Sequence, residues 1–194
     1  EEPVEEIPDY PVNLFFTQEG YFKKITPLSL RMSGEQKLKE GDEVVRTIET
    51  KNNAQLLFFT SAQQVYKCRV GDFADGKASV MGDYIAARLG MEEGETPVYM
   101  ALTEDYAGHM LFLFENGKCA KVPMQSYATK QNRKKLINAY SDKAKLVWAA
   151  YLHEEAELAV TTSAGGMLLV HSAQIPEKQT KNTAGVNVLT LKKN

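Results

Sequence analysis

The sequence predicts an all-β fold built from about four similar units. An apolar hairpin pattern recurs four times along the 194 residues, and three copies are followed by a polar connection and a further short apolar strand. A single hairpin cannot bury its apolar face alone, whereas stacked neighbours can. We therefore expect an acidic linker at residues 1–10, followed by four blade-like units at about 11–53, 54–107, 108–155 and 156–194.

Each hairpin combines an apolar strand, a short turn and a second strand. The four copies are Leu14–Lys24, Leu57–Lys67, Phe112–Val122 and Val160–Val170. Their turn positions are occupied by Gly20, Gln63, Gly117 and Gly165, at intervals of about 43 to 54 residues, which is typical of propeller-like repeats. In the third copy the pair Asn116-Gly117 is a strong hairpin signal, because both residues tolerate positive φ.

The further strands are short runs rich in Val, Ile, Tyr and Trp, as expected of strands rather than helices. They are Asp42–Ile48, Pro97–Leu102 and Leu146–Leu152. The polar connections between strands are Ser29–Gly41, Gly71–Gly94 and Gln125–Lys143, and one helical turn is expected at Tyr84–Leu89. We expect the aromatic residues of the strands to form blade cores: Phe15, Phe16, Phe58, Phe59, Phe112, Phe114 and Trp148.

Composition excludes several classes of protein. The chain is 43% hydrophobic and 25% charged, as in soluble globular proteins, and no apolar run approaches the roughly 20 residues of a membrane span. Cys68 and Cys119 are too few for a disulfide framework or a four-ligand zinc set, and free thiols suit a reducing cytoplasm. His109, His153 and His171 lack metal-ligand spacing, so we expect no metal, no cofactor and no catalytic residue.

The order of several segments resembles one known family. Gly20–Ser29 resembles the opening of the first blade in the C-terminal domain of the A subunit of bacterial type IIA topoisomerases, which are DNA gyrase and topoisomerase IV. The resemblance continues through Leu56–Thr60, and Lys178–Val188 is similar to a recurrent Asn-Thr-x-Gly-Val segment of that family. It covers essentially the whole chain after residue 11.

The resemblance implies a β-pinwheel, a ring of four-stranded blades that exchange strands and bend DNA around their outer rim. It implies a domain without catalysis of its own, because the breakage-reunion domain lies upstream in this family and the start at Glu1-Glu2-Pro3 indicates a piece of a longer polypeptide. The implied partners are the phosphate backbone of double-stranded DNA, without sequence specificity, the rest of the A subunit, and through it the ATPase B subunit. The implied location is the bacterial cytoplasm at the nucleoid, with no membrane partner.

One stretch departs from the gyrase pattern. Gyrase carries a box of the form Gln-Arg-Arg-Gly-Gly-Lys-Gly in its first blade, whereas Arg31–Gly41 keeps scattered basic residues and introduces Glu35 and Glu40. The departure favours topoisomerase IV or a diverged paralogue over gyrase. The alternative interpretation is a propeller-like protein-interaction module with weak or no DNA wrapping.

The formal charge of −2 is a sum of alternating blocks. Residues 21–70 carry +4, 109–145 carry +6 and 178–194 carry +4, whereas the segments between and before them are acidic. Basic residues therefore concentrate on the hairpins and the loops that follow them, which are the elements that the resemblance places toward DNA.

Lysine and arginine side chains spaced along a curved surface hold bent DNA through its phosphates without reading sequence. Lys24, Lys67 and Lys121 occupy the same place in three units, four residues after the turn position. Lys130, Arg133, Lys134 and Lys135 form the densest basic cluster. The remaining predicted DNA-contacting residues are Lys23, Arg31, Lys37, Lys39, Arg69, Lys118, Lys178 and Lys181.

Overall fold

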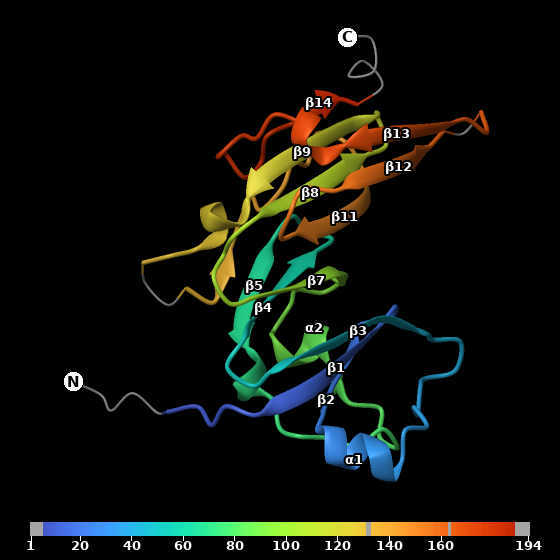
Figure 1. Ribbon diagram of the computed structural model, residues 1–194, viewed down its shortest axis with the longest axis vertical. Coiled ribbons are helices and arrows are strands. Elements are labelled where there is room, and N and C mark those ends of the chain that lie inside the picture. Colours follow the sequence, from blue (N-terminus) through green and yellow to red (C-terminus); the bar gives the residue numbers. More distant parts are fainter. Residues whose placement is uncertain (1–5, 131–132, 163, 189–194) are drawn as a thin grey trace. The chain divides into compact units, whose positions relative to one another are not determined.

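The structure is a computed structural model that describes residues 6–130, 133–162 and 164–188. The predicted all-β fold is confirmed, with antiparallel sheets and only short helical turns (Figure 1). In the described part of the chain, no helix has the length and apolar character needed to cross a membrane. Half of the predicted linker, residues 1–5, lies outside the described residues.

All four predicted hairpins form. They are β1 (Pro11–Thr17) with β2 (Tyr21–Ile25), β4 (Gln55–Thr60) with β5 (Val65–Arg69), β8 (His109–Phe114) with β9 (Lys118–Pro123), and β12 (Glu157–Thr161) with β13 (Met167–His171). The four equivalent turn positions share a left-handed backbone, with φ of +92° at Gly20, +54° at Gln63, +81° at Gly117 and +81° at Gly165. The repeat in the sequence is therefore a repeat in backbone conformation.

The three predicted further strands also form, as β3 (Val44–Lys51), β7 (Pro97–Thr103) and β11 (Leu146–Leu152). Each pairs antiparallel with the first strand of the hairpin before it, so that β3 pairs with β1, β7 with β4 and β11 with β8. This pairing gives a three-stranded sheet from consecutive segments of the chain.

Three two-residue strands were not predicted. They are β6 (Asp83–Tyr84), β10 (Lys135–Leu136) and β14 (Val186–Asn187). The strand orders are β3-β1-β2-β6, β10-β5-β4-β7, β11-β8-β9-β14 and β12-β13, so the described residues form three four-stranded sheets and one two-stranded sheet. In the first sheet the outer strand β6 follows the hairpin β4–β5 in sequence yet pairs with β2, which is an exchange of strands between successive units.

A helical turn follows the second strand of every hairpin. These turns are α1 (Pro27–Met32), η1 (Val70–Asp72), η2 (Met124–Tyr127) and η3 (Ser172–Gln174), whereas α2 (Ile85–Arg88) is the helical turn that the sequence predicts. The expected polar connection thus begins with helix α1. The signals for it were present in the sequence, because Thr26 accepts a hydrogen bond from the Ser29 amide as N-cap and Pro27 occupies the first turn.

One backbone hydrogen bond closes three of the hairpins in the same way. The amide of Val70 donates to the Ala54 carbonyl, that of Met124 to Gly108, and that of Ser172 to Ala156, at distances of 2.8–3.0 Å. In each pair the donor follows the acceptor by 16 residues. The same bond at the same spacing supports the assignment of these segments as structural repeats.

The chain divides into two compact units. Unit 1 comprises Glu1–Ala62 and Tyr66–Glu104, and unit 2 comprises Gln63–Val65 and Asp105–Asn194. In the core of unit 1, Phe16 and Phe22 from the first hairpin pack on Phe58 from the second, with ring centroids 5.8 and 6.1 Å apart.

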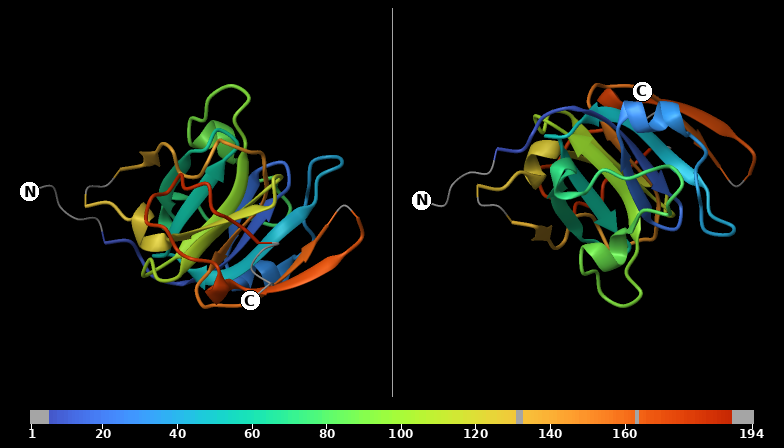
Figure 2. Two further views of the ribbon diagram at one scale, coloured as in Figure 1. Left: turned by 90° about the horizontal axis from the view of Figure 1, so that it is seen from above. Right: turned by 90° about the horizontal axis from the view of Figure 1, so that it is seen from below.

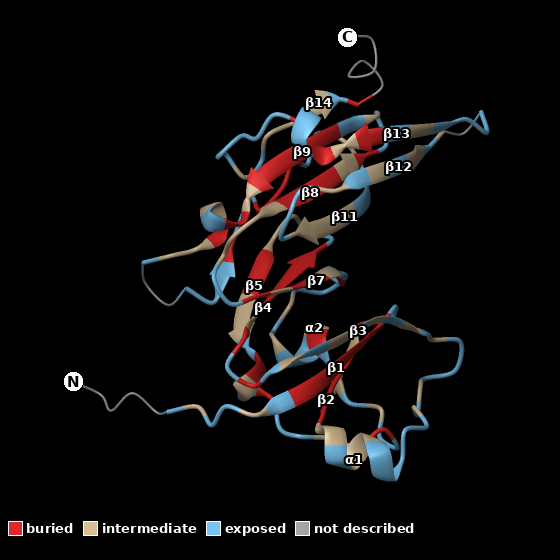
Figure 3. Ribbon diagram, in the orientation of Figure 1, coloured by how far each residue is buried: buried red, intermediate tan, exposed pale blue. Residues whose placement is uncertain are grey.

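In unit 2 the core lies between the β8–β9 sheet and the segment from β13 to β14, and contains Leu111, Cys119, Val170, Ile175 and Val188. Figure 3 shows that the buried residues concentrate in the strands of the first three hairpins, and Figure 2 shows the β12–β13 hairpin as a projecting ribbon. The predicted aromatic core is confirmed for the phenylalanines, whereas Trp148 is 41% exposed, because β11 is an outer strand of its sheet.

The turn glycines predict a matched pair of stability effects. Gly165→Ala should lower the free energy of unfolding by about 1 kcal/mol, because alanine disfavours the left-handed backbone and nothing lies within 4 Å of the added Cβ. Gly20→Ala should cost about 2–3 kcal/mol, because the Cβ would also meet Pro97 Cγ at 3.0 Å. Urea unfolding measures both, and equal costs would contradict the steric part of the argument.

Candidate nucleic-acid interface

Lys24, one of the recurring lysines, lies in β2 and is only 3% exposed. Its ammonium nitrogen donates to Asn52 Oδ1 at 2.8 Å and lies 3.3 Å from Asp75 Oδ1. The Tyr10 hydroxyl donates to the same Asp75 oxygen at 2.8 Å, and the Lys24 ammonium lies 5.8 Å from the centre of the Tyr10 ring. The charge of Lys24 is therefore held by partners within unit 1.

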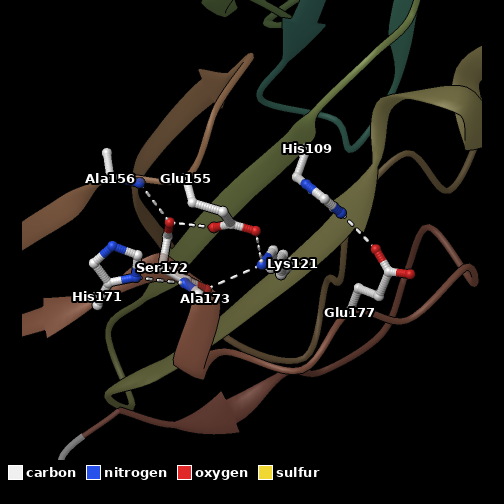
Figure 4. A network of polar contacts seen from close by, with 8 residues as sticks. All are labelled: His109, Lys121, Glu155, Ala156, His171, Ser172, Ala173 and Glu177. Atoms are coloured by element: carbon white, nitrogen blue, oxygen red, sulfur yellow. Dashed lines mark hydrogen bonds and ion pairs between the residues drawn. The ribbon is translucent and has the colours of Figure 1, made fainter.

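Lys121 occupies the equivalent place in β9 and is 5% exposed. Its Nζ lies 2.6 Å from Glu155 Oε1 and donates to the Ser172 carbonyl at 3.0 Å (Figure 4). The Ser172 hydroxyl donates to the other Glu155 oxygen and accepts from the Ala156 amide. The hydrogen bonds from Lys121 and Ser172 lower the pKa of Glu155. This network joins β9 to both ends of the β12–β13 hairpin.

Lys23, the neighbour of Lys24 in β2, is 3% exposed and faces the other side of the strand. Its ammonium group donates to Gln36 Oε1 at 3.0 Å, to the Lys37 carbonyl at 2.8 Å and to the Ala78 carbonyl at 3.0 Å. Burial lowers the pKa of Lys23. All three donors of the ammonium are used inside unit 1.

Contact of Lys23, Lys24 and Lys121 with DNA therefore remains a prediction, and their burial and internal hydrogen bonds argue against it. A phosphate cannot reach these ammonium groups without breaking their hydrogen bonds and opening the surrounding packing, and a buried charge without partners is costly. Lys67, the third recurring lysine, is half-buried, and burial lowers its pKa. Its contact with DNA remains a prediction.

The other predicted residues lie at the surface. Lys181 is half-buried, and ten are exposed, namely Arg31, Lys37, Lys39, Arg69, Lys118, Lys130, Arg133, Lys134, Lys135 and Lys178.

In unit 1, three of the predicted basic residues, Arg31, Lys37 and Lys39, lie on α1 and the segment after it, whereas Arg69 ends β5. The Lys37 amide donates to the Ala78 carbonyl at 2.8 Å, which anchors this segment. Lys39 forms an ion pair with Glu19 at 3.4 Å, and both side chains are about half exposed. Surface pairs of this kind contribute little to stability, so a phosphate can compete for Lys39.

In unit 2, six of the predicted basic residues lie on two segments far apart in the sequence, whereas Lys118 begins β9. Lys130, Arg133, Lys134 and Lys135 lie between η2 and the end of β10, and Lys178 and Lys181 precede β14. The Ser126 hydroxyl at η2 donates to the Gln179 carbonyl at 2.9 Å. The fold thus brings together the two basic segments, which the sequence alone left unconnected.

Sequence reasoning omitted several exposed basic residues, namely Lys51, Lys77, Arg88, Lys143 and Lys145. Only their charge could have pointed to them, since none lies at a repeated position. Arg88 is also engaged locally, because its guanidinium donates to the Asp72 carbonyl at 2.8 Å and lies over the Phe73 ring.

The described residues contain no group of three or more His, Cys, Asp or Glu side chains that could hold a metal ion. Burial raises the pKa of the Cys68 thiol to about 12 and that of Cys119 to about 11, so neither is a thiolate near neutral pH. His109 Nε2 lies 2.5 Å from Glu177 Oε2, and His153 Nε2 lies 3.3 Å from Asp105. These are isolated pairs in which no nucleophile takes part.

Comparison of the sequence with known proteins finds relatives among the type IIA topoisomerases. The family described as DNA gyrase C-terminal domain, β-propeller, matches residues 156–194. The A subunit of DNA topoisomerase 4 from Staphylococcus epidermidis is 27% identical over 191 residues, which cover 96% of this chain, and its counterpart from Staphylococcus aureus is 23% identical over the same length. The chain spans about a quarter of these relatives, 24% of their length.

Comparison of the fold finds similar solved structures. The C-terminal domain of DNA topoisomerase IV aligns with a TM-score of 0.78 and 22% identity over 94% of this chain and 58% of that one. The DNA gyrase A C-terminal domain aligns with a TM-score of 0.67 and 17% identity, covering 95% and 63% of the two chains. The E. coli ParC C-terminal domain aligns with a TM-score of 0.64 and 19% identity, covering 89% and 70%.

The strand-exchanged antiparallel sheets and these alignments define the fold as a β-pinwheel. Within that class, the predicted resemblance to the C-terminal domain of a type IIA topoisomerase A subunit is confirmed.

The buried lysines predict a stability effect that separates them from surface lysines. Lys121→Met should lower the free energy of unfolding by about 1–3 kcal/mol, because it removes the charge-assisted hydrogen bonds that Lys121 donates to the Ser172 carbonyl and the Glu155 carboxylate. Lys118→Met on the same strand, where Lys118 is exposed, is the control and should change stability by less than about 0.5 kcal/mol. Equal effects in urea unfolding would contradict a structural role for Lys121.

The lowered pKa of Glu155 predicts a pH dependence. The ionised carboxylate is favoured in the folded state, so its contribution to stability is present above the ordinary value of 4.5 and is lost as the pH falls through the lowered folded-state pKa. Glu155→Gln should therefore destabilise the protein at pH 7 and have a much smaller effect at about pH 3. A difference from the wild type that does not change with pH would exclude this linkage.

Proposed function

We propose that this chain is a DNA-binding and DNA-bending domain of a type IIA topoisomerase A subunit, without catalysis of its own. It presents a DNA segment to the breakage-reunion core of the same polypeptide, which acts with the ATPase B subunit. One observation carries the proposal. The fold is similar to that of such domains, and both unit 1 and unit 2 expose clustered lysine and arginine residues on their connecting segments.

The physical argument concerns charge and bending. Duplex DNA is held mainly through its phosphates, and each lysine or arginine contact releases counterions without reading the base sequence. Bending the duplex over two to three helical turns costs on the order of 1–6 kcal/mol, so several contacts must contribute along the bend. Since three of the predicted lysines are buried, the exposed basic surface is sparser than the sequence suggests, so we expect fewer phosphate contacts and a modest affinity that falls as the salt concentration rises.

The densest cluster predicts a measurable salt effect. Replacement of Arg133, Lys134 and Lys135 by Gln should weaken binding to a random-sequence duplex at about 50 mM salt. It should also reduce the slope of log affinity against log salt by up to about 0.9 for each lost phosphate contact. Fluorescence anisotropy over a salt series measures both quantities.

The matched control replaces Lys51, Lys77 and Lys145, three exposed lysines outside the predicted set, by Gln. An equal loss of affinity in both triple variants would show that only net charge matters. Absence of duplex binding by the wild-type chain at about 50 mM salt would overturn the proposed function.

One observation favours the alternative, a protein-interaction module. The outer strand β11 exposes apolar side chains, with Val147 54% and Trp148 41% exposed, and both line a groove of about 420 Å³ together with Val160. Met167 and Leu169 on β13 are also 66% and 52% exposed. Exposed apolar patches on a protein mark contacts with other molecules. This alternative predicts that the domain binds duplex DNA weakly and leaves the writhe of DNA minicircles unchanged.

A further inference from the structure

We infer that unit 2 carries a built site for one phosphate group, between η2, the end of β10 and the segment that precedes β14. The identity of the ligand, a backbone phosphate of duplex DNA, rests on the proposed function. The site is a cavity of about 480 Å³ whose lining residues are Ser126, Ile137, Asn138, Gln179, Thr180, Lys181 and Asn182.

The fold assembles this cavity from three separate segments. The Ser126 hydroxyl donates to the Gln179 carbonyl at 2.9 Å, which joins the η2 side to the segment before β14. The Thr183 amide donates to the Thr180 carbonyl at 3.2 Å, which closes a tight turn around Lys181. These two hydrogen bonds hold the η2 side and the segment before β14 together at the cavity.

The lining favours an anion. It contains one ammonium group, the side-chain amides of Asn138, Gln179 and Asn182 and the Thr180 hydroxyl, but no carboxylate. Lys181 is half-buried and has no ion-pair partner among the described residues. A lysine in this state gains a charge-assisted hydrogen bond when an anion enters.

The surroundings add positive charge. Two lining residues, Ile137 and Asn138, directly follow β10, and the basic residues Arg133, Lys134 and Lys135 come just before them in the sequence. Lys178 comes just before the lining residues 179–182. The nearest acidic residue in sequence, Glu177, is engaged with His109 at 2.5 Å. Basic residues therefore outnumber acidic ones in the segments that line the cavity, which favours an anionic ligand.

The size and the mixed lining fit a sugar-phosphate segment better than a free ion. A volume of about 480 Å³ exceeds that of one phosphate group, and the Ile137 side chain, 64% exposed, offers an apolar surface to the carbon atoms of a neighbouring sugar. The amide and hydroxyl groups supply neutral donors for phosphate oxygens, as in many protein contacts to nucleic-acid backbones.

The first test compares two lysines of equal charge. Lys181→Gln should weaken binding of the full chain to a random-sequence duplex roughly tenfold and reduce the salt slope by about 0.9. Lys143→Gln removes the same charge from an exposed lysine outside the cavity lining and should change affinity less than about twofold. Equal effects of the two substitutions would overturn the site.

The second test uses neutral donors, which a diffuse electrostatic surface does not need. Asn182→Ala should weaken duplex binding several-fold without changing the salt slope, because an amide contact to phosphate releases no counterion. Circular dichroism and urea unfolding verify that the variants fold. Unchanged affinity in a folded Asn182→Ala variant would contradict the proposed contacts.

A third measurement separates this inference from the proposed function. Titration of the wild-type chain with pyrophosphate, followed by NMR, should shift the backbone amides of residues 179–182, and Lys181→Gln should abolish these shifts. Shifts of these amides together with no duplex binding would support the phosphate site and overturn the proposed function. Duplex binding without any such shifts, and with equal effects of Lys181→Gln and Lys143→Gln, would overturn the site alone.

Discussion

The structure depends on the pairing of the second hairpin strand with a segment from later in the chain, which the described residues show for three of the four hairpins. In unit 1, β2 pairs with β6 through Tyr21 opposite Tyr84 and Phe22 opposite Asp83, and in unit 2, β9 pairs with β14 through Cys119 opposite Val186. Without these short strands, β2 and β9 would expose a row of unpaired backbone groups. The connecting segments must therefore return to an earlier hairpin, the one before the hairpin that they follow, and this return determines where their side chains lie.

The buried lysines follow from this arrangement. Lys24 pairs with Asp75 and Lys23 donates to the Ala78 carbonyl, and both acceptors lie on the connection that leads to β6. Lys121 likewise holds Glu155 from the segment between β11 and β12. These lysines hold the returning segments on the hairpins. The basic residues of the repeat thus have two separate roles, in which some stabilise the fold and others, at the surface, provide positive potential.

The same returning segments build the candidate phosphate site. Residues after β10 and residues before β14 are about 40 positions apart in sequence, yet they line one cavity beside η2. Like charges gathered in this way repel one another, and the packing of β10, η2 and β14 offsets that repulsion. Such a surface gains free energy when a polyanion neutralises it, which links the architecture of unit 2 to the proposed function.

The sequence by itself determined the hairpins, the three further strands and the equivalent turn positions, because alternation and turn chemistry are local properties. It also contained enough pattern to identify the family resemblance. Helix α1 was within its reach, since Thr26 and Pro27 are ordinary helix-start signals.

Only the tertiary structure decided where the charges go. The two-residue strands β6, β10 and β14 are too short to show any alternation, and they form because a neighbouring strand offers an open edge. Lys24 and Lys23 find acceptors 28 and 55 residues away, and Lys121 finds one 34 residues away. A charge pattern cannot distinguish a lysine that faces solvent from one that faces a distant carboxylate, because that difference arises only when the chain returns on itself.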